Sequence, residues 1–163
     1  MALYTPDELE RIYFLPSAAS VSAPTVANFT AGEDITDAIV SMSGFTFAAN
    51  KTEVPNLGSR FTPSVSGRLT AEDSSIEFYK GDSATDLEEI VRVLLPRGAD
   101  GYIARVHPKD GAQAAIAAAT KVEMWPVEVM SNSIAPPVPG EAAKFTVQFS
   151  IPRQPNQSAT IAA

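Results

Sequence analysis

The sequence predicts a mainly β protein, a β-sandwich or barrel flanked by one α-helix. Three observations indicate this class. Residues 145–151 alternate strictly between apolar and polar side chains, which is the pattern of a strand with one buried face. Shorter segments repeat this alternation along the chain. Only one segment, residues 83–95, shows the clear apolar spacing of an amphipathic helix.

The composition suits a single domain spanning residues 1–163. With 45% hydrophobic residues, the chain can bury a core and is too apolar for wholesale disorder. It has no cysteine, which excludes disulfides and thiolate metal sites. The 12 basic and 19 acidic residues give a net charge of −7 without any basic run, so tight binding to a phosphate backbone is not expected.

Neither a membrane span nor a signal peptide is predicted. No apolar run approaches the roughly 18 residues that a span requires. Residues 1–15 contain three acidic residues and lack the basic segment and apolar run of a signal peptide. We therefore expect synthesis in the cytoplasm, without export by that route.

Residues 1–30 are predicted to form an extended N-terminal arm, because prolines punctuate a segment rich in Ser, Ala and Thr. A short helix could begin there, with Thr5 as its N-cap and with Ile12 and Tyr13 on its apolar side. The alternative is a tail without fixed structure.

The β core is assigned to residues 31–153, and residues 154–163 are expected to form a frayed polar tail. The first main strand is predicted at residues 38–48, followed by a long polar inter-strand loop at residues 49–59. Further strands are predicted at residues 60–70, 75–80 and 101–106, and a loose loop at residues 109–119.

The helix predicted at residues 83–95 has one apolar stripe, formed by Leu87, Ile90, Val91 and Leu94. Acidic residues lie near its N-terminus, where the helix dipole favours negative charge. A proline and a glycine follow its last turn and end it. We expect this helix to pack on the side of the β core.

Residues 121–151 are predicted to form two strands joined by a long loop. Pro126 cannot donate to a strand ladder, so the first strand should bulge or bend there. The connection at residues 132–143 contains three prolines and a glycine, which favours an extended loop. Because an isolated hairpin is marginal in water, the rest of the chain must supply a sheet for it to join.

No catalytic constellation is evident in the sequence. His107 is the only histidine, and we interpret it as an ordinary turn residue after a strand. Adjacent carboxylates, such as Glu88 and Glu89, point in different directions on a helix and indicate a solvated surface. The serine-hydrolase and phosphate-loop motifs do not occur. We therefore expect a protein that is not an enzyme and that uses no cofactor or metal.

The order of these elements resembles the major tail tube proteins of long-tailed bacteriophages, and the type VI secretion tube proteins look similar in architecture. The resemblance spans residues 38–151. It is carried by the residues that lead into and form the helix, by the strand that follows, and by the two last strands: residues 78–94, 101–106, 121–129 and 145–151.

This resemblance implies a structural protein of the virion tail. Copies of the chain would form hexameric rings whose sheets join into a continuous inner barrel. The rings would stack into the tube through which the genome leaves. The implied partners are other copies of this chain, the tape-measure protein, other tail proteins, and passing DNA bound without sequence specificity.

Two alternative functions remain compatible with the sequence. The chain could be a different virion part, such as a tail terminator or a head–tail connector. It could also be a stand-alone cellular β-domain that binds a ligand. Electron microscopy of the purified protein separates the three, since they predict long tubes, small rings and a monomer.

The resemblance assigns contacts between adjacent rings to the N-terminal arm and to the long loop after the first strand. The loop residues expected to make these contacts are Lys51, Glu53, Pro55, Asn56 and Gly58.

At least one of the polar faces of two alternating strands should line the lumen of the tube. The candidate residues are Thr62, Ser64, Ser66, Arg68, Lys144, Thr146, Gln148 and Ser150. Their neighbours should be buried on the domain side, namely Val65, Leu69, Phe145, Val147 and Phe149. The alternative for the polar faces is an ordinary outer surface in contact with solvent.

We expect the lumen to be net acidic or near neutral, because several fixed cations would hold passing phosphates by salt-dependent contacts. Arg68 and Lys144 are the two basic residues on the assigned faces. Nearby carboxylates are expected to pair with them or to outnumber them, with Glu72, Glu123 and Glu128 as candidates.

Overall fold

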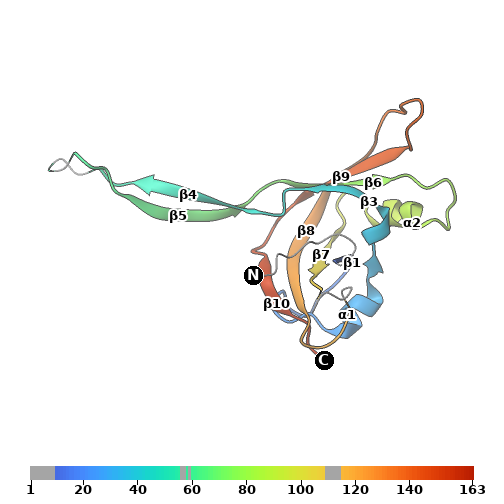
Figure 1. The fold of residues 1–163 in the computed structure, drawn as a ribbon, viewed down its shortest axis with the longest axis horizontal. Helices are drawn as coiled ribbons and strands as arrows, with labels where there is room; N and C mark the ends of the chain where they lie inside the picture. Colours follow the sequence, from blue (N-terminus) through green and yellow to red (C-terminus); the bar gives the residue numbers. More distant parts are fainter. Residues whose placement is uncertain (1–9, 56–57, 59, 109–114) are drawn as a thin grey trace.

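In the computed structural model, which describes residues 10–55, 58, 60–108 and 115–163, most strands belong to one antiparallel sheet (Figure 1). The strand order is β2-β1-β7-β8-β9-β6-β3, and β10 pairs with β8 beside this path. These strands are β1 (Arg11–Leu15), β2 (Glu33–Asp34), β3 (Ile39–Ser43), β6 (Ser74–Tyr79), β7 (Asp100–Val106), β8 (Lys121–Ile134), β9 (Lys144–Ser150) and β10 (Asn156–Thr160).

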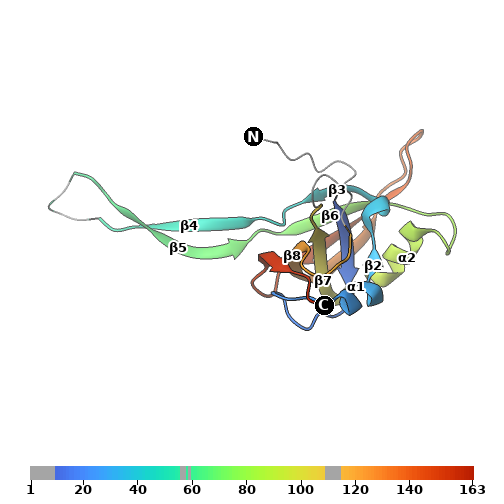
Figure 2. The same cartoon turned by 60° about the horizontal axis from the view of Figure 1, so that its bottom comes forward.

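A second, two-stranded sheet is formed by β4 (Phe47–Glu53) and β5 (Ser64–Ala71). It projects from the body as a long ribbon (Figures 1 and 2). The helices are short: α1 (Val26–Ala31), the 3₁₀ turn η1 (Thr36–Ala38) and α2 (Leu87–Leu94). The predicted mainly β class is confirmed, with α2 as the longer of the two α-helices in the part of the chain that the structure describes.

The long strand β8 connects the two halves of the sheet. Its first half pairs with β7 and β10, and its second half pairs with β9. The sheet curls around a core to which both halves contribute, with Trp125, Phe145 and Phe149 among its largest side chains. Helix α2 adds Val91, and Leu95 follows it, both fully buried. Each such side chain contributes roughly 1.5–3 kcal/mol through burial.

A second core lies on the opposite face of β1, β7 and β8. Leu15, Tyr102 and Met124 from these strands pack there against Phe29 of α1 and Ile161 after β10. Strands that are buried on both faces have nearly continuous apolar sequences, and Gly101–Val106 has such a sequence.

Residues 10–30 belong to the body, so the predicted N-terminal arm is wrong for this part of the chain. β1 lies between β2 and β7, and Phe14 and Leu15 are buried on its two faces. Ile12 and Tyr13, expected on a helix, are strand residues. The helix start expected at Thr5 lies outside the described residues. Burial on both faces removes the alternation that would have marked this strand.

The predicted frayed tail is also wrong. β10 pairs antiparallel with the first half of β8. Ala159 and Ile161 are each 1% exposed, and Thr25 forms a parallel bridge with Ala162. The composition of residues 156–160 does not predict a strand, but the pairing with β8 makes this polar segment one.

The predicted first strand is divided at a turn that starts the ribbon. Gly44 has φ +80° and Phe45 has φ 54°, so the chain leaves β3 and enters β4. A Cβ on Gly44 would lie 2.5 Å from the Asp73 carbonyl oxygen. The segment at residues 49–59 is therefore no simple loop, since Lys51 and Glu53 belong to β4.

The helix is shorter than predicted, with Asp86 at the N-cap position. The carboxylate of Asp86 accepts hydrogen bonds from the N–H groups of Asp82 and Ser83, which form the turn before the helix. Val91 is buried as expected, whereas Ile90 is 39% exposed. The strands predicted at residues 75–80 and 101–106 and the final hairpin are confirmed as β6, β7 and β8–β9.

The bulge predicted at Pro126 is wrong, because β7 and β8 pair in register through it. Val129 N–H donates to Ala99 O, and Lys121 O accepts from His107 N–H, so odd-numbered residues of β8 direct their backbone groups to the β7 side. Pro126 faces the other edge, between the end of the β10 pairing and the start of the β9 pairing. Its missing N–H therefore costs no hydrogen bond to β7.

Candidate functional site

Residues 47–71, which we call the arm, form a ribbon without a core of its own. Every described residue from Arg60 to Thr70 is exposed. Val65 is 54% exposed and Leu69 is 53% exposed, so the prediction that they are buried on the domain side is wrong. A two-stranded hairpin alone is marginally stable in water. The exposed apolar residues on such a ribbon indicate a surface that contacts another chain.

A register shift exchanges the two faces of the arm half-way along its length. Ala49 pairs with Leu69, and Lys51 pairs with Ser66, so β5 contains one extra residue between these pairs. Beyond the shift, Val65 pairs with Thr52. Positions 49 and 52 lie on opposite faces of β4, so Leu69 and Val65 also lie on opposite faces. In the inner half of the arm, the apolar residue Leu69 therefore lies on one face. In the outer half, the apolar residue Val65 lies on the other face.

The root of the arm is fixed by aromatic packing. The ring of Phe47 lies 5.4 Å from that of Trp125, and Phe45 meets Trp125 edge-on at 5.7 Å. The buried Ser74 hydroxyl accepts the N–H of Phe45 at 2.9 Å. These contacts fix the point at which the arm leaves the body.

The second surface is the polar face of β3, β6, β9 and the end of β8. On β9, Phe145, Val147 and Phe149 are buried, as predicted. The alternate residues face outward beside polar neighbours, with Thr146 paired to Glu77 and Gln148 paired to Ser75. The other members of this face include Ser41, Ser43, Tyr79, Glu128, Ser131, Ser133, Lys144 and Ser150.

Carboxylates outnumber Lys144 on this polar face, because Glu77 lies beside it and Glu128 pairs with Ser150 across the sheet. Lys144 Nζ lies 3.9 Å from Glu77 Oε2. Of the three carboxylates expected to pair with or outnumber the basic residues, Glu128 lies on this face opposite Ser150. Glu72 instead accepts from Thr46, and Glu123 lies in a separate cluster. The cross-strand register of β6 and β9 decides this pairing, and the sequence does not display it.

The structure does not bring the two predicted sets of lumen residues together. Lys144, Thr146, Gln148 and Ser150 lie on β9 of the body. Ser64, Ser66 and Arg68 lie on β5 of the arm, and Thr62 precedes that strand. Of the predicted inter-ring residues, Lys51, Glu53, Pro55 and Gly58 are exposed on the arm, and Asn56 lies outside the described residues.

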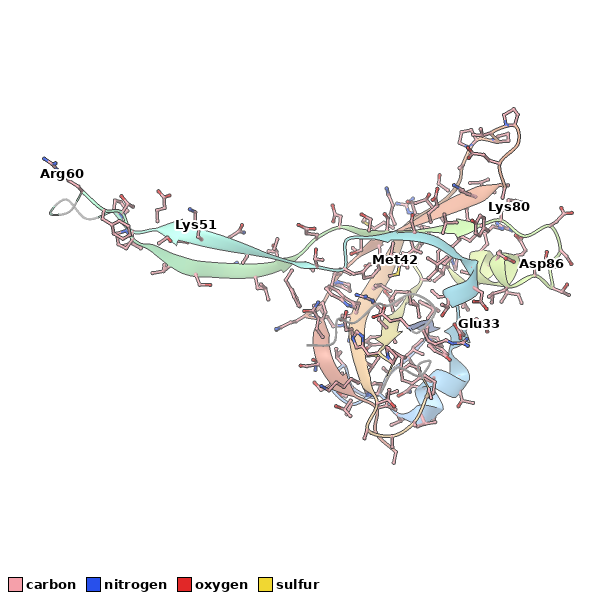
Figure 3. The ribbon with its side chains drawn as sticks, viewed as in Figure 1. Glu33, Met42, Lys51, Arg60, Lys80 and Asp86 are labelled. Carbon is pink, nitrogen blue, oxygen red and sulfur yellow. The ribbon has the colours of Figure 1, made fainter. Side chains whose placement is uncertain are left out.

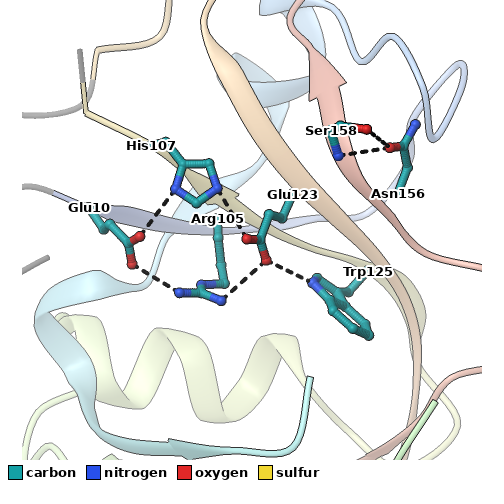
Figure 4. Close-up of polar contacts among 7 residues, drawn as sticks. All are labelled: Glu10, Arg105, His107, Glu123, Trp125, Asn156 and Ser158. Atoms are coloured by element: carbon teal, nitrogen blue, oxygen red, sulfur yellow. Dashed lines mark hydrogen bonds and ion pairs between the residues drawn. The ribbon is translucent and has the colours of Figure 1, made fainter. Parts of the chain in front are cut away.

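A cluster of charged side chains lies where β1, β7 and β8 meet (Figure 4). Arg105 bridges Glu10 and Glu123 with N–O distances of 3.2 Å. His107 bridges the same two carboxylates, also at 3.2 Å. The indole N–H of Trp125 donates to Glu123 at 3.3 Å. We call these five residues the ion cluster.

The ion cluster changes the protonation of its members. The hydrogen bond to Glu123 raises the pKa of His107, against desolvation, with help from the charges of Glu123 and Glu10. Burial alone would raise the pKa of Glu123, but hydrogen bonds from His107 and Trp125 and the charge of Arg105 lower it. The cluster therefore stabilises the ionised carboxylate and the protonated imidazole together.

Sequence reasoning missed the ion cluster by treating His107 as an ordinary turn residue. Ile103, Arg105 and His107 alternate along one face of β7 and its extension, and Glu123 pairs with Arg105 across the sheet. The alternation is visible in the sequence, but the partner strand and its register are not. Within the described residues, no group of His, Asp and Glu side chains is arranged to hold a metal ion.

The structure thus presents an exposed arm and a polar sheet face beside a packed body. The family described as phage tail tube protein matches residues 2–163, and the chain belongs to this family. It is therefore a structural component of a phage-type tail. No curated protein is significantly similar in sequence. Among the described residues, no helix is long and apolar enough to cross a membrane.

Solved structures with the same fold include chains of two phage-like particles. One is a chain of the anti-feeding prophage (AFP) baseplate, solved by cryo-electron microscopy with six-fold symmetrisation; identity is 10%, the TM-score is 0.63, and 96% of each chain is covered. The other is the tail of an empty GTA particle computed with helical refinement and C6 symmetry. Identity is 15%, the TM-score is 0.52, and 97% of this chain and 100% of that chain are covered.

Proposed function

We propose that this chain forms hexameric rings that stack into a tail tube, the conduit for genome delivery. The arm is the observation that carries this proposal, because an exposed ribbon with apolar residues requires a second chain to cover it. Its residues Lys51, Glu53, Pro55, Asn56 and Gly58 are assigned to contacts with the adjacent ring. The AFP and GTA particles, whose chains share this fold, have six-fold or C6 symmetry, which supports the same ring size.

Within a ring, the sheets of neighbouring copies join. β3 ends the strand order of the main sheet, and the described residues pair it only with β6. An unpaired edge strand of this kind can pair with strands of other chains and cause aggregation. Joining β3 to the sheet of the next copy would satisfy the edge and extend the sheet around the ring.

The polar face of β9 is assigned to the lumen, with Lys144, Thr146, Gln148 and Ser150 among its lining. Its carboxylates Glu77 and Glu128 outnumber Lys144, which suits a wall along which DNA slides without being held. Thr62, Ser64, Ser66 and Arg68 are assigned to the arm contacts and not to the lumen. The further proposed partners are the tape-measure protein, other tail proteins and passing DNA, and synthesis takes place in the host cytoplasm.

Electron microscopy and light scattering of the purified protein test this function. We expect particles that grow with concentration into tubes with six-fold end views. Rings that never stack would instead support a tail terminator or connector. A species that stays monomeric at all concentrations would contradict assembly as the function.

A further inference from the structure

A groove of about 550 Å³ lies between α2, the end of β1 and the segment from α1 to β2. Its walls are largely apolar and include Ile90 and Val93 of α2 together with Phe14 and Pro16. Val93 is 66% exposed, which is unusual for a valine on a helix that packs against a core. An apolar groove with an exposed rim is a common form of docking surface.

The outer half of the arm has the complementary chemistry. Val54 and Val65 are 47% and 54% exposed, and the register places them on the same face, beyond the shift. Val54 N–H donates to Pro63 O, which continues this pairing toward the end of the arm. Two β-branched side chains in line would cover the exposed face of Val93 and Ile90 by a direct apolar contact.

The charges of the arm and the groove are also complementary. Residues 47–71 contain three basic residues and one acidic residue, a net charge of +2, so the other residues of the −7 chain carry −9. Glu33 and Glu89 line the groove, and Glu89 already forms an ion pair with Arg92, so Glu33 carries the excess negative charge of this lining. Figure 3 shows Lys51 and Arg60 on the arm, whereas Glu33 and Asp86 lie on the opposite side of the molecule.

The arm of one copy points away from its own groove. The ribbon of β4 and β5 leaves one side of the body, and α2 lies on the other side in both views (Figures 1 and 2). The contact must therefore form between copies. A surface at one end that binds a different surface at the other end is a head-to-tail contact, which builds closed rings or open helical filaments.

We propose that the groove beside α2 receives the outer half of the arm, around Val54 and Val65, from a second copy of this chain. This inference rests on the proposed tube, and it identifies the surface of the second copy to which the arm binds. The inner half of the arm carries its exposed apolar residue Leu69 on the other face, so it is not assigned to this groove.

Engineered disulfides test the contact, because the chain has no cysteine of its own. Val93→Cys is combined in turn with Val54→Cys, with Val65→Cys, and with Ser64→Cys as the matched control on the opposite face of the arm. Each variant is assembled, examined by electron microscopy and oxidised. A disulfide requires Cα atoms closer than about 7 Å, so only direct neighbours link.

We expect a ladder of covalent oligomers from the Val54 or Val65 variant, several-fold stronger than from the Ser64 control. Reducing agent should remove the ladder. Tubes that form normally but show no such preference would overturn this inference while leaving the proposed function intact. Unmodified protein that forms no tubes would overturn both. The changed residues are exposed, so thermal unfolding should show that each variant keeps its fold.

Discussion

Ser74 shows how one buried hydroxyl fixes the start of the arm. Its Oγ accepts from Phe45 N–H and donates to Glu72 O at 3.1 Å. Ser74→Ala leaves the buried Phe45 N–H without its acceptor, so we expect a loss of about 1–3 kcal/mol in the free energy of unfolding. Chemical denaturation measures this loss.

Ser75→Ala is the matched control, since Ser75 lies on the polar face of the same strand and is only partly buried. Its effect should stay within about 0.5 kcal/mol. Equal losses in the two variants would show that the Phe45 contact is not the source of the stabilisation.

The ion cluster predicts a specific dependence of stability on pH. Because the folded state raises the pKa of His107 above about 6.5, its contribution is present below that pH and is lost as pH rises through the folded pKa. The lowered pKa of Glu123 gives a contribution present above about pH 4.5, which is lost as pH falls through the folded pKa. These two groups therefore contribute together between those limits.

Thermal unfolding from about pH 5 to about pH 9 measures the alkaline side of this dependence. The unmodified protein should lose stability as His107 gives up its proton beside Glu10 and Glu123. His107→Gln removes the titrating group, so this part of the slope should disappear. An unchanged slope in the variant would assign the effect to another residue.

At the scale of elements, the arm is separable from the body. Phe47 and Ala71 at its root pack against the first core, but no residue from Arg60 to Thr70 is buried, so the rest of the arm adds little to either core. Replacing residues 51–58 with a short turn should leave the unfolding midpoint of the body nearly unchanged and should prevent tube formation. Circular dichroism and electron microscopy measure the two outcomes. Normal tubes from the shortened chain would contradict the assignment of the arm to inter-ring contacts.

At the scale of the whole molecule, a tube should present a lumen that is near neutral or acidic. Glu77 pairs with Lys144, and Glu128 adds a second carboxylate to the polar face. Thr146→Lys with Gln148→Lys should convert the wall into a cationic surface that retains DNA in a salt-dependent manner. Binding of linear DNA to assembled tubes measures the change.

The matched control is Thr146→Ser with Gln148→Asn, which keeps the face polar and uncharged. A tube map with the β9 face on the outside, or a clear positive excess in the lumen of the unmodified tube, would contradict the lumen assignment.

The opposite charges of arm and body predict that assembly depends on salt. Exposed charges are screened beyond about 10 Å at 0.1 M salt and beyond about 3 Å at 1 M salt. Raising the salt concentration should therefore increase the protein concentration at which tubes appear, as measured by light scattering. Arg68→Gln should reduce this salt dependence. Assembly that strengthens steadily with salt would indicate that apolar contacts dominate.

The sequence by itself determined the elements whose pattern depends on local burial. β9 alternates because one face is buried, and α2 has an apolar stripe because one side packs on the core. These periods are set by strand and helix geometry, so they can be read without knowing the partner. The mainly β class and the final hairpin followed from them.

Only the tertiary structure decided which segments join the sheet and what each exposed face meets. β1 is buried on both faces and β10 is ordered by its pairing with β8, so neither shows a clear local period. The ion cluster needs the register of β7 and β8 to bring Arg105 beside Glu123. The apolar residues of β5 look like core in the sequence, but Val65 and Leu69 project on the arm, because β4 and β5 pair only with each other and no layer of this chain covers them.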